Sequence, residues 1–152
     1  PNRFRGIRHN VTWNTDPSWD NRETEGILAN TDFIAGAKVL SQKGLSLDIM
    51  QSFPQMPEIA VFAKAVPELP IIVNHIGGVS RVGIFAGKDD EIIPVWKAGI
   101  TALAACPNVT MKLGGMGMPR FGYDWHAREV PIGSEELAEA MRNFIHIVLS
   151  GI

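Results

Sequence analysis

The chain has 152 residues, 45% of them hydrophobic, and its 14 basic and 16 acidic side chains leave a formal net charge of −2. We expect residues 1–152 to form a single domain, since this length can bury a sizeable core. The scattered, nearly balanced charge lacks the basic footprint of proteins that bind nucleic acids or anionic membranes. No apolar run reaches the ~18 residues that a membrane span requires. A small-molecule substrate is therefore the expected partner.

Cysteine usage and the start of the chain bear on the compartment. Cys106 is the only cysteine, and it precedes Pro107 at the end of a predicted helix. We predict a reduced, buried thiol in a cytoplasmic protein. No basic and then apolar leader opens the chain. Its start at Pro1 rather than at methionine predicts processing or a fragment.

Four strand-then-helix units follow one another along the chain. Strands are predicted over 5–9 with Val11, 45–50, 71–75 and 109–113. Helices are predicted over about 32–43, from Pro57 to Pro67, from 89–90 to Pro107, and from Ser134 onward. Thr31 and Ser134 are the expected N-caps, and Gly44 the residue that ends the first helix. This alternation is typical of an α/β fold with a parallel sheet and right-handed crossovers.

The buried helix faces follow from apolar spacing. On the third helix we expect Trp96, Ile100 and Leu103 to be buried. On the last helix the apolar face is expected to comprise Leu137, Met141, Phe144 and Val148.

The connecting loops differ strongly in length between the two ends of the predicted strands. Strand-to-helix loops cover 12–31, 77–89 and 114–133, whereas helix-to-strand loops cover only 41–44, 67–70 and 106–108. Long loops without their own structure are usually functional. In a βα fold they mark the face at the carboxyl ends of the strands. We therefore expect a binding site there.

Polar residues near those strand ends are the candidates for chemistry. They are Arg8, His9, Asp48, Gln51, Gln55, Asn74, His75 and Lys112. Side chains alternate along a strand, so Arg8 and His9 are not expected to face the same side, nor are Asn74 and His75. Lys112 lies among apolar residues and needs a counter-ion, for which Asp48 is the nearest choice, in either a structural or a catalytic pair. His75 is either functional or bound to a neighbouring carbonyl.

Metal-ligand spacing gives only a weak signal. His9, His75 and His126 are far apart, and no His-x-His, Cys-x-x-Cys or His-Glu-x-x-His motif occurs. His146, in the last predicted helix, is expected to be structural or at the surface.

Several stretches, in order along nearly the whole chain, resemble amidohydrolase-related proteins, a branch described as metal-dependent hydrolases of the TIM-barrel fold. They are residues 5–9, 44–48, 54–55, 71–78, 96–99, 103–109, 111–118 and 134–137. The branch includes lactone hydrolases and, more distantly, aromatic-acid decarboxylases. The resemblance implies an eight-stranded barrel of roughly 250 residues or more, of which this chain supplies about four central βα units, a partial TIM barrel.

The resemblance also implies roles for individual residues. His75 matches a mid-barrel histidine that binds the metal, where one is present, or contacts the substrate carbonyl. Arg8 matches an arginine that faces the ligand. Position alone, and not the resemblance, makes Lys112 the third catalytic candidate. Position near the strand ends or on the long loops likewise gives the expected substrate-binding residues, which are His9, Asp48, Gln55, Asn74, Arg81, Trp125 and His126.

Some parts of the family pattern are not in this sequence. The first-strand His-x-His pair and the last-strand aspartate, the general base of such proteins, are missing from the 152 residues. Ser52 and Phe53 stand where Tyr-His is expected before Pro54. The resemblance implies one divalent metal ion, zinc or manganese, in the full-length parent, or none.

Three functions remain open at this point. The first is a segment of a hydrolase that opens a lactone or related cyclic ester by activated water. The second is a metal-dependent decarboxylase of an aromatic acid on the same barrel. The third is a non-catalytic half-barrel with an apolar interior and open strand edges, which would assemble with itself or with another partner.

Overall fold

A computed structural model describes all residues except 1–2, 15, 17–23 and 152. The strands are β1 (Gly6–Asn10), β2 (Ser46–Met50), β3 (Ile71–Val73) and β4 (Val109–Met111). The helices are α1 (Thr31–Gln42), α2 (Met56–Ala65), α3 (Asp89–Ala104) and α4 (Ser134–Ser150). Short 3₁₀ turns lie at Ile27–Ala29, Phe53–Gln55, His75–Gly77, Gly83–Phe85, Pro119–Phe121 and Trp125–Ala127.

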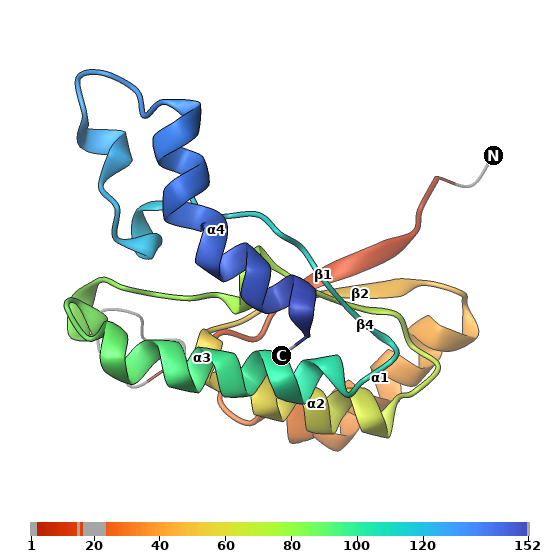
Figure 1. Cartoon of the computed structure of the whole chain (residues 1–152). Coiled ribbons are helices and arrows are strands. Elements are labelled where there is room, and N and C mark those ends of the chain that lie inside the picture. The colour runs from red at the N-terminus through yellow and green to blue at the C-terminus, as the bar shows by residue number, and fades with distance from the viewer. Residues whose placement is uncertain (1–2, 15, 17–23, 152) are drawn as a thin grey trace.

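The strands form one parallel sheet in the order β1-β2-β3-β4. Each crossover between neighbouring strands contains a helix, and α1, α2 and α3 lie together on one side of the sheet (Figure 1). The predicted α/β class and the parallel sheet are confirmed. The arrangement corresponds to an open part of a βα barrel.

The core lies between the sheet and these helices. Side chains that alternate along β2 and β3, such as Leu47, Ile49 and Ile71, are at most 2% exposed. Trp96, Ile100 and Leu103 are buried on α3 as predicted. Cys106 is also buried, and its thiol lies 3.6 Å from the carbonyl oxygen of Ala102.

The opposite face of the sheet is open and mainly polar. Arg8 is in register with Asp48 on β2, and Thr110 lies on the same face of β4. Arg8 and Thr110 are exposed and Asp48 is half-buried. The expected apolar interior is therefore wrong. Polar side chains occupy this face because it does not contact the helix layer.

Both predicted serine and threonine caps are displaced by one residue. Asn30, not Thr31, caps α1, and its Oδ1 accepts hydrogen bonds from the backbone N–H groups of Asp32 and Phe33. Ser134 is the first residue of α4, not its cap. Gly44 follows α1 with φ of +65°, as expected for a residue that ends a helix.

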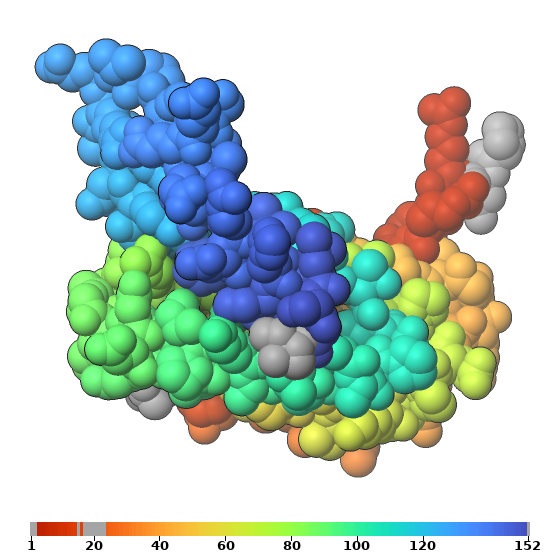
Figure 2. Space-filling view, viewed as in Figure 1, coloured from red at the N-terminus to blue at the C-terminus, as the bar shows by residue number. Residues whose placement is uncertain are grey.

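Helix α4 packs against the body by only part of its length. Met141 is buried, and the Phe144 ring lies 5.4 Å from the Trp96 ring. Leu137 belongs to the predicted apolar face of α4 but is 40% exposed. The reason is visible in Figure 2, where the first turns of α4 and the segment before them project from the body. None of the described helices is long and apolar enough to cross a membrane.

Candidate functional site

Strand register brings polar side chains together on the open face of the sheet. Arg8 and Asp48 are directly in register on β1 and β2. Asn74 and Lys112 lie just beyond β3 and β4, where the backbone remains extended: Lys112 N–H donates to the Val73 carbonyl at 2.9 Å. We call Arg8, Asp48, Asn74 and Lys112 the polar cluster. Asn74 and Lys112 lie just beyond the carboxyl ends of β3 and β4, whereas Arg8 and Asp48 are the middle residues of β1 and β2.

Direct contacts join the members of the polar cluster. Arg8 Nη2 donates to Asn74 Oδ1 at 3.0 Å and lies 3.5 Å from Asp48 Oδ2. The Lys112 ammonium also binds Asp48, so the predicted ion pair is present. The Asn74 amide is fully buried, and its Nδ2 donates to the Ile49 carbonyl at 2.9 Å. Asn74 therefore holds the Arg8 guanidinium against the sheet.

His75 follows Asn74 but does not continue the strand. The strand predicted over 71–75 ends at Val73, and His75 and Ile76 adopt φ of +52° and +50°. Such left-handed backbone is uncommon outside glycine and is a genuine outlier for a β-branched residue. Because the strand has ended, the alternation rule does not separate Asn74 from His75. The prediction that the strand continues to His75 fails because contacts from other elements impose this turn.

Two distant elements bind the backbone of that turn. The Ile76 N–H donates to the Lys112 carbonyl at 2.9 Å, and the indole Nε1 of buried Trp96 donates to the Ile76 carbonyl at 2.8 Å. Gly115 lies against the imidazole, since a Cβ there would be 2.7 Å from His75 Nδ1. Trp96 and Gly115 were not among the candidate residues.

The surroundings of His75 favour the neutral imidazole. Burial lowers the pKa of His75 below its ordinary value, and the positive charges of Arg8, Arg120 and Lys112 lower it further. Arg120 is only 7% exposed, and its Nη2 donates to the Gly78 carbonyl at 2.9 Å. Sequence reasoning missed Arg120. The available signal was a charged residue within an otherwise apolar and glycine-rich loop.

His9 lies on the other face of β1 from Arg8. Its ring packs 5.3 Å from the ring of Phe33 on α1. The predicted separation of Arg8 and His9 is therefore confirmed, with Arg8 on the open face. A substrate-binding role for His9 stays a prediction.

Gln55 and Gln51 are buried and bind backbone. Gln55 Oε1 accepts from the N–H groups of Trp13 and Ser52, and its Nε2 donates to the Val11 carbonyl at 2.8 Å. Gln51 Nε2 donates to the Asn74 carbonyl at 2.9 Å. Gln55 thus shapes the loop after β1, whereas Gln51 supports the end of β3.

The remaining predicted residues lie on the loops. Arg81 Nε donates to Asp89 at 2.8 Å, and its guanidinium lies 5.0 Å from the Tyr123 ring centroid. The Trp125 ring stacks on Tyr123 at 4.3 Å, and the next residue, His126, is exposed. None of the interactions found in the described part of the chain links these residues to the polar cluster.

The described residues do not by themselves fit a metal ion. Across residues 3–14, 16 and 24–151 no three His, Cys, Asp or Glu side chains gather as a metal-binding group. His75 offers a neutral nitrogen, but Asp48 is already bound by Lys112 and Arg8. The surrounding cations also oppose a second positive charge. A metal at this position would need donors beyond the described residues.

The chain is similar to known proteins over most of its length. A family model described as amidohydrolase matches residues 2–143. The uncharacterized protein y4mH of Sinorhizobium fredii is 30% identical over 137 residues, which are 89% of this chain and 43% of that protein. The L-fucono-1,5-lactonase of Burkholderia multivorans is 24% identical over 114 residues, covering 75% of this chain and 36% of that protein.

Solved structures show the same fold. A crystal structure of an amidohydrolase from Burkholderia multivorans with bound zinc has a TM-score of 0.75 at 20% identity, covering 99% of this chain and 46% of that one. Amidohydrolase 2 from Bifidobacterium longum subsp. infantis has a TM-score of 0.55 at 23% identity, covering 96% and 41%. The chain spans less than half the length of each of these proteins.

Proposed function

The chain belongs to the amidohydrolase family, and from this premise we propose that it is a segment of a hydrolase that opens a lactone or related cyclic ester of a small organic or sugar acid. The name of one relative, L-fucono-1,5-lactonase, supports the lactone class. The observation that supports this proposal most directly is the polar cluster on the open face of the sheet, beside the His75 imidazole, which its surroundings keep neutral. The activity is proposed for the parent protein that contains this segment.

Arg8 is the proposed substrate-binding cation. Its side chain is 53% exposed although one guanidinium nitrogen is held by Asn74 and Asp48. A guanidinium has five N–H donors, so others remain for a carboxylate or hydroxyl oxygen of the substrate. Arg8 therefore orients a sugar-acid substrate over the open face of the sheet.

His75 and Lys112 act on the carbonyl group in this proposal. The neutral imidazole of His75 has one N–H donor, which polarises the carbonyl oxygen by a hydrogen bond. As water adds to the carbonyl carbon, negative charge develops on that oxygen. The Lys112 side chain is 44% exposed, and its ammonium group lowers the energy of this charge electrostatically.

The attacking water needs a general base. Asp48 is a poor choice, because its carboxylate is bound by Lys112 and Arg8. The family resemblance predicts an aspartate on the last strand of the barrel, outside this sequence, for that task. No step of the proposal passes through a metal ion, and a zinc or manganese ion in the parent protein stays a prediction. The 152-residue chain assayed alone is expected to hydrolyse little or no lactone.

The test is proton release by the parent protein with a panel of sugar-acid lactones. Lactone opening yields a carboxylic acid, which ionises near neutral pH and releases a proton. We expect His75→Asn and Arg8→Met to lower kcat/KM by about 100-fold or more, and Val61→Ser, an exposed change on α2, to have no effect. Asparagine tolerates left-handed backbone, so His75→Asn keeps the turn.

Two results would contradict this function. One is the absence of proton release with every lactone, and the other is full activity in both variants. Release of carbon dioxide from an aromatic acid would instead identify the decarboxylase alternative.

A further inference from the structure

Three side-chain donors from separate elements bind alternate backbone carbonyl groups of the turn that follows β3. Gln51 Nε2 donates to Asn74 at 2.9 Å, Trp96 Nε1 to Ile76 at 2.8 Å and Arg120 Nη2 to Gly78 at 2.9 Å. The donor to Asn74 differs from the other two in its position. It binds the peptide bond through which the chain enters His75.

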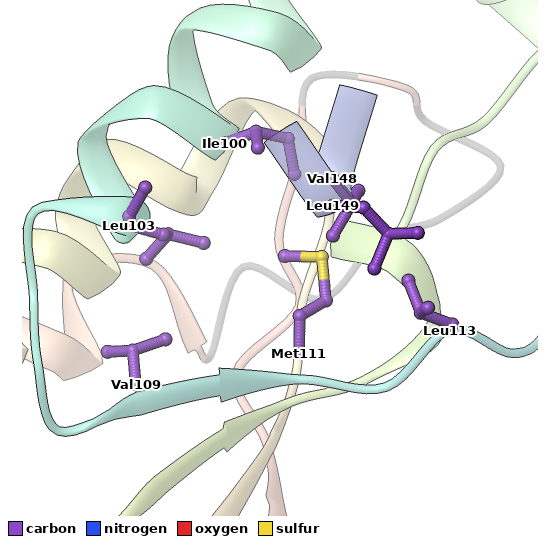
Figure 3. Close-up of a pocket in the computed structure, with 8 residues that line it drawn as sticks. Ile100, Leu103, Val109, Met111, Leu113, Val148 and Leu149 are labelled. Atoms are coloured by element: carbon purple, nitrogen blue, oxygen red, sulfur yellow. The ribbon is translucent and has the colours of Figure 1, made fainter. Parts of the chain in front are cut away.

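The backbone of Lys112, just beyond β4, binds the same turn from another side. Its carbonyl accepts the Ile76 N–H at 2.9 Å. Met111 and Leu113, on either side of Lys112, point toward apolar side chains of α3 and α4 (Figure 3). This side of the turn is therefore anchored by apolar packing, whereas the peptide bond before His75 is bound by a polar side chain.

That polar side chain is fully buried. Gln51 follows β2 directly and is 0% exposed, and its Oε1 accepts no hydrogen bond from the described residues. A buried acceptor without a partner lowers stability. A methionine would fill about the same space without that cost. Stability therefore does not account for a glutamine here, and the property that a methionine would lack is the hydrogen bond to Asn74.

Asn74 connects this hydrogen bond to both proposed functional groups. Its side-chain Oδ1 accepts from Arg8 Nη2 at 3.0 Å. Its carbonyl group shares a planar peptide bond with the nitrogen of His75, where φ is +52°. The Gly77 N–H also donates to that carbonyl, at 3.2 Å, but Gly77 belongs to the turn itself. The donor from β2 is Gln51, and it sets how the chain enters His75.

We propose that Gln51 is a positioning residue, which fixes the direction of the His75 imidazole relative to the Arg8 guanidinium. The inference rests on the proposed function, in which Arg8 binds the substrate and His75 polarises its carbonyl group. Because Gln51 is fully buried, it acts through Asn74 and not on the substrate. Misplacing a reacting group by about 1 Å can cost about 100-fold in rate, so a small rotation of the peptide bond is enough to matter.

The experiment compares Gln51→Met with wild type in the parent protein. Lactone hydrolysis is measured together with NMR spectra of ¹⁵N-labelled histidine at a pH of about 8, where histidine is uncharged. We expect kcat to fall by about 10- to 100-fold. KM should change by less than about threefold, because Arg8 keeps its contact with Asp48. The His75 signals, assigned by their loss in His75→Asn, should shift.

A second variant makes the test independent of how one substitution folds. Gln51→Asn keeps an amide but is one methylene shorter, so its donor does not reach the Asn74 carbonyl. It should lower kcat and shift the His75 signals as Gln51→Met does.

Asn108→Leu is the matched control. Asn108 Nδ2 also donates to backbone carbonyl groups, those of Ala63, Val66 and Leu69, at 3.1 Å each. It precedes β4 and so lies at the opposite end of the sheet from His75. This variant should lower the urea midpoint and leave kcat, KM and the His75 signals unchanged.

Several outcomes would overturn the inference. They are His75 signals that do not move in either Gln51 variant, a wild-type kcat in both, equal shifts in Asn108→Leu, or loss of folding in both Gln51 variants, which would make the glutamine structural. A wild-type parent that hydrolyses no lactone would refute the proposed function instead. The His75 signals would then still decide whether Gln51 positions the imidazole.

Discussion

Trp96 donates its indole N–H to the carbonyl oxygen of Ile76 across 2.8 Å, which ties α3 to the turn that carries His75. Both backbone groups of Ile76 are bound, since its N–H donates to the Lys112 carbonyl. Left-handed backbone at residues other than glycine costs of order 1–3 kcal/mol each. Contacts from α3 and from the residue that follows β4 therefore maintain a backbone conformation that His75 and Ile76 themselves disfavour.

The first prediction concerns this hydrogen bond. Trp96→Phe removes the donor and leaves the buried Ile76 carbonyl without it, so we expect the free energy of unfolding to fall by about 1–3 kcal/mol. Urea denaturation measures the change. Tyr123→Phe is the control, because it removes a less buried hydrogen bond to the Ala140 carbonyl and should cost less. Equal losses in the two variants would contradict a special role for Trp96.

The second prediction concerns the contact of Gly115 with His75. Gly115 has φ of +80°, and a Cβ would lie 2.7 Å from His75 Nδ1. We expect Gly115→Ala to lower stability by about 1–3 kcal/mol and to shift the imidazole signals in NMR spectra. Gly117→Ala, with no atom within 4 Å of the added carbon, should stay within about 0.5 kcal/mol of wild type. An unchanged His75 spectrum in Gly115→Ala would refute the contact.

The third prediction separates stability from function in the polar cluster. Arg8 and Lys112 are 53% and 44% exposed, so their ion pairs with Asp48 are largely screened by water. We expect Arg8→Met and Lys112→Met each to lower the free energy of unfolding by less than about 1 kcal/mol. A double-mutant cycle with Asp48→Asn measures the coupling. A loss of several kcal/mol would mean that the cluster is structural.

The fourth prediction is a pH dependence of stability. The folded chain holds the pKa of His75 below its ordinary value of 6.5, so the unfolded chain takes up a proton first as the pH falls. Stability should therefore decline as the pH falls from about 6.5 toward the folded pKa. His75→Asn should remove this part of the decline, as measured by urea midpoints across that range. A decline of the same steepness in wild type and variant would show that other groups cause it.

Local sequence patterns were sufficient to predict much of the architecture. The spacing of Trp96, Ile100 and Leu103 predicted the buried face of α3, and Gly44 predicted the end of α1. Unequal loop lengths predicted a binding site at the carboxyl ends of the strands, which stays a prediction, and a lone lysine in an apolar strand predicted its pairing with Asp48. The helix face, the helix end and the loop lengths are each encoded within one helix or one loop, so periodicity and residue type reveal them. The Lys112–Asp48 pair joins residues 64 apart and followed instead from the cost of an unpaired charge among apolar residues.

The site itself depended on contacts between distant segments. Arg8 and Asn74 are 66 residues apart, and the turn at His75 is held by Trp96, 20 residues beyond Ile76. A β-branched run predicted that the strand would continue to His75, because intrinsic preference carries no record of such partners. The sequence by itself therefore determined the βα order and predicted on which face of the sheet a site would lie. Tertiary structure decided where β3 ends and which cations surround His75, because only packing supplies the free energy that sustains a disfavoured turn.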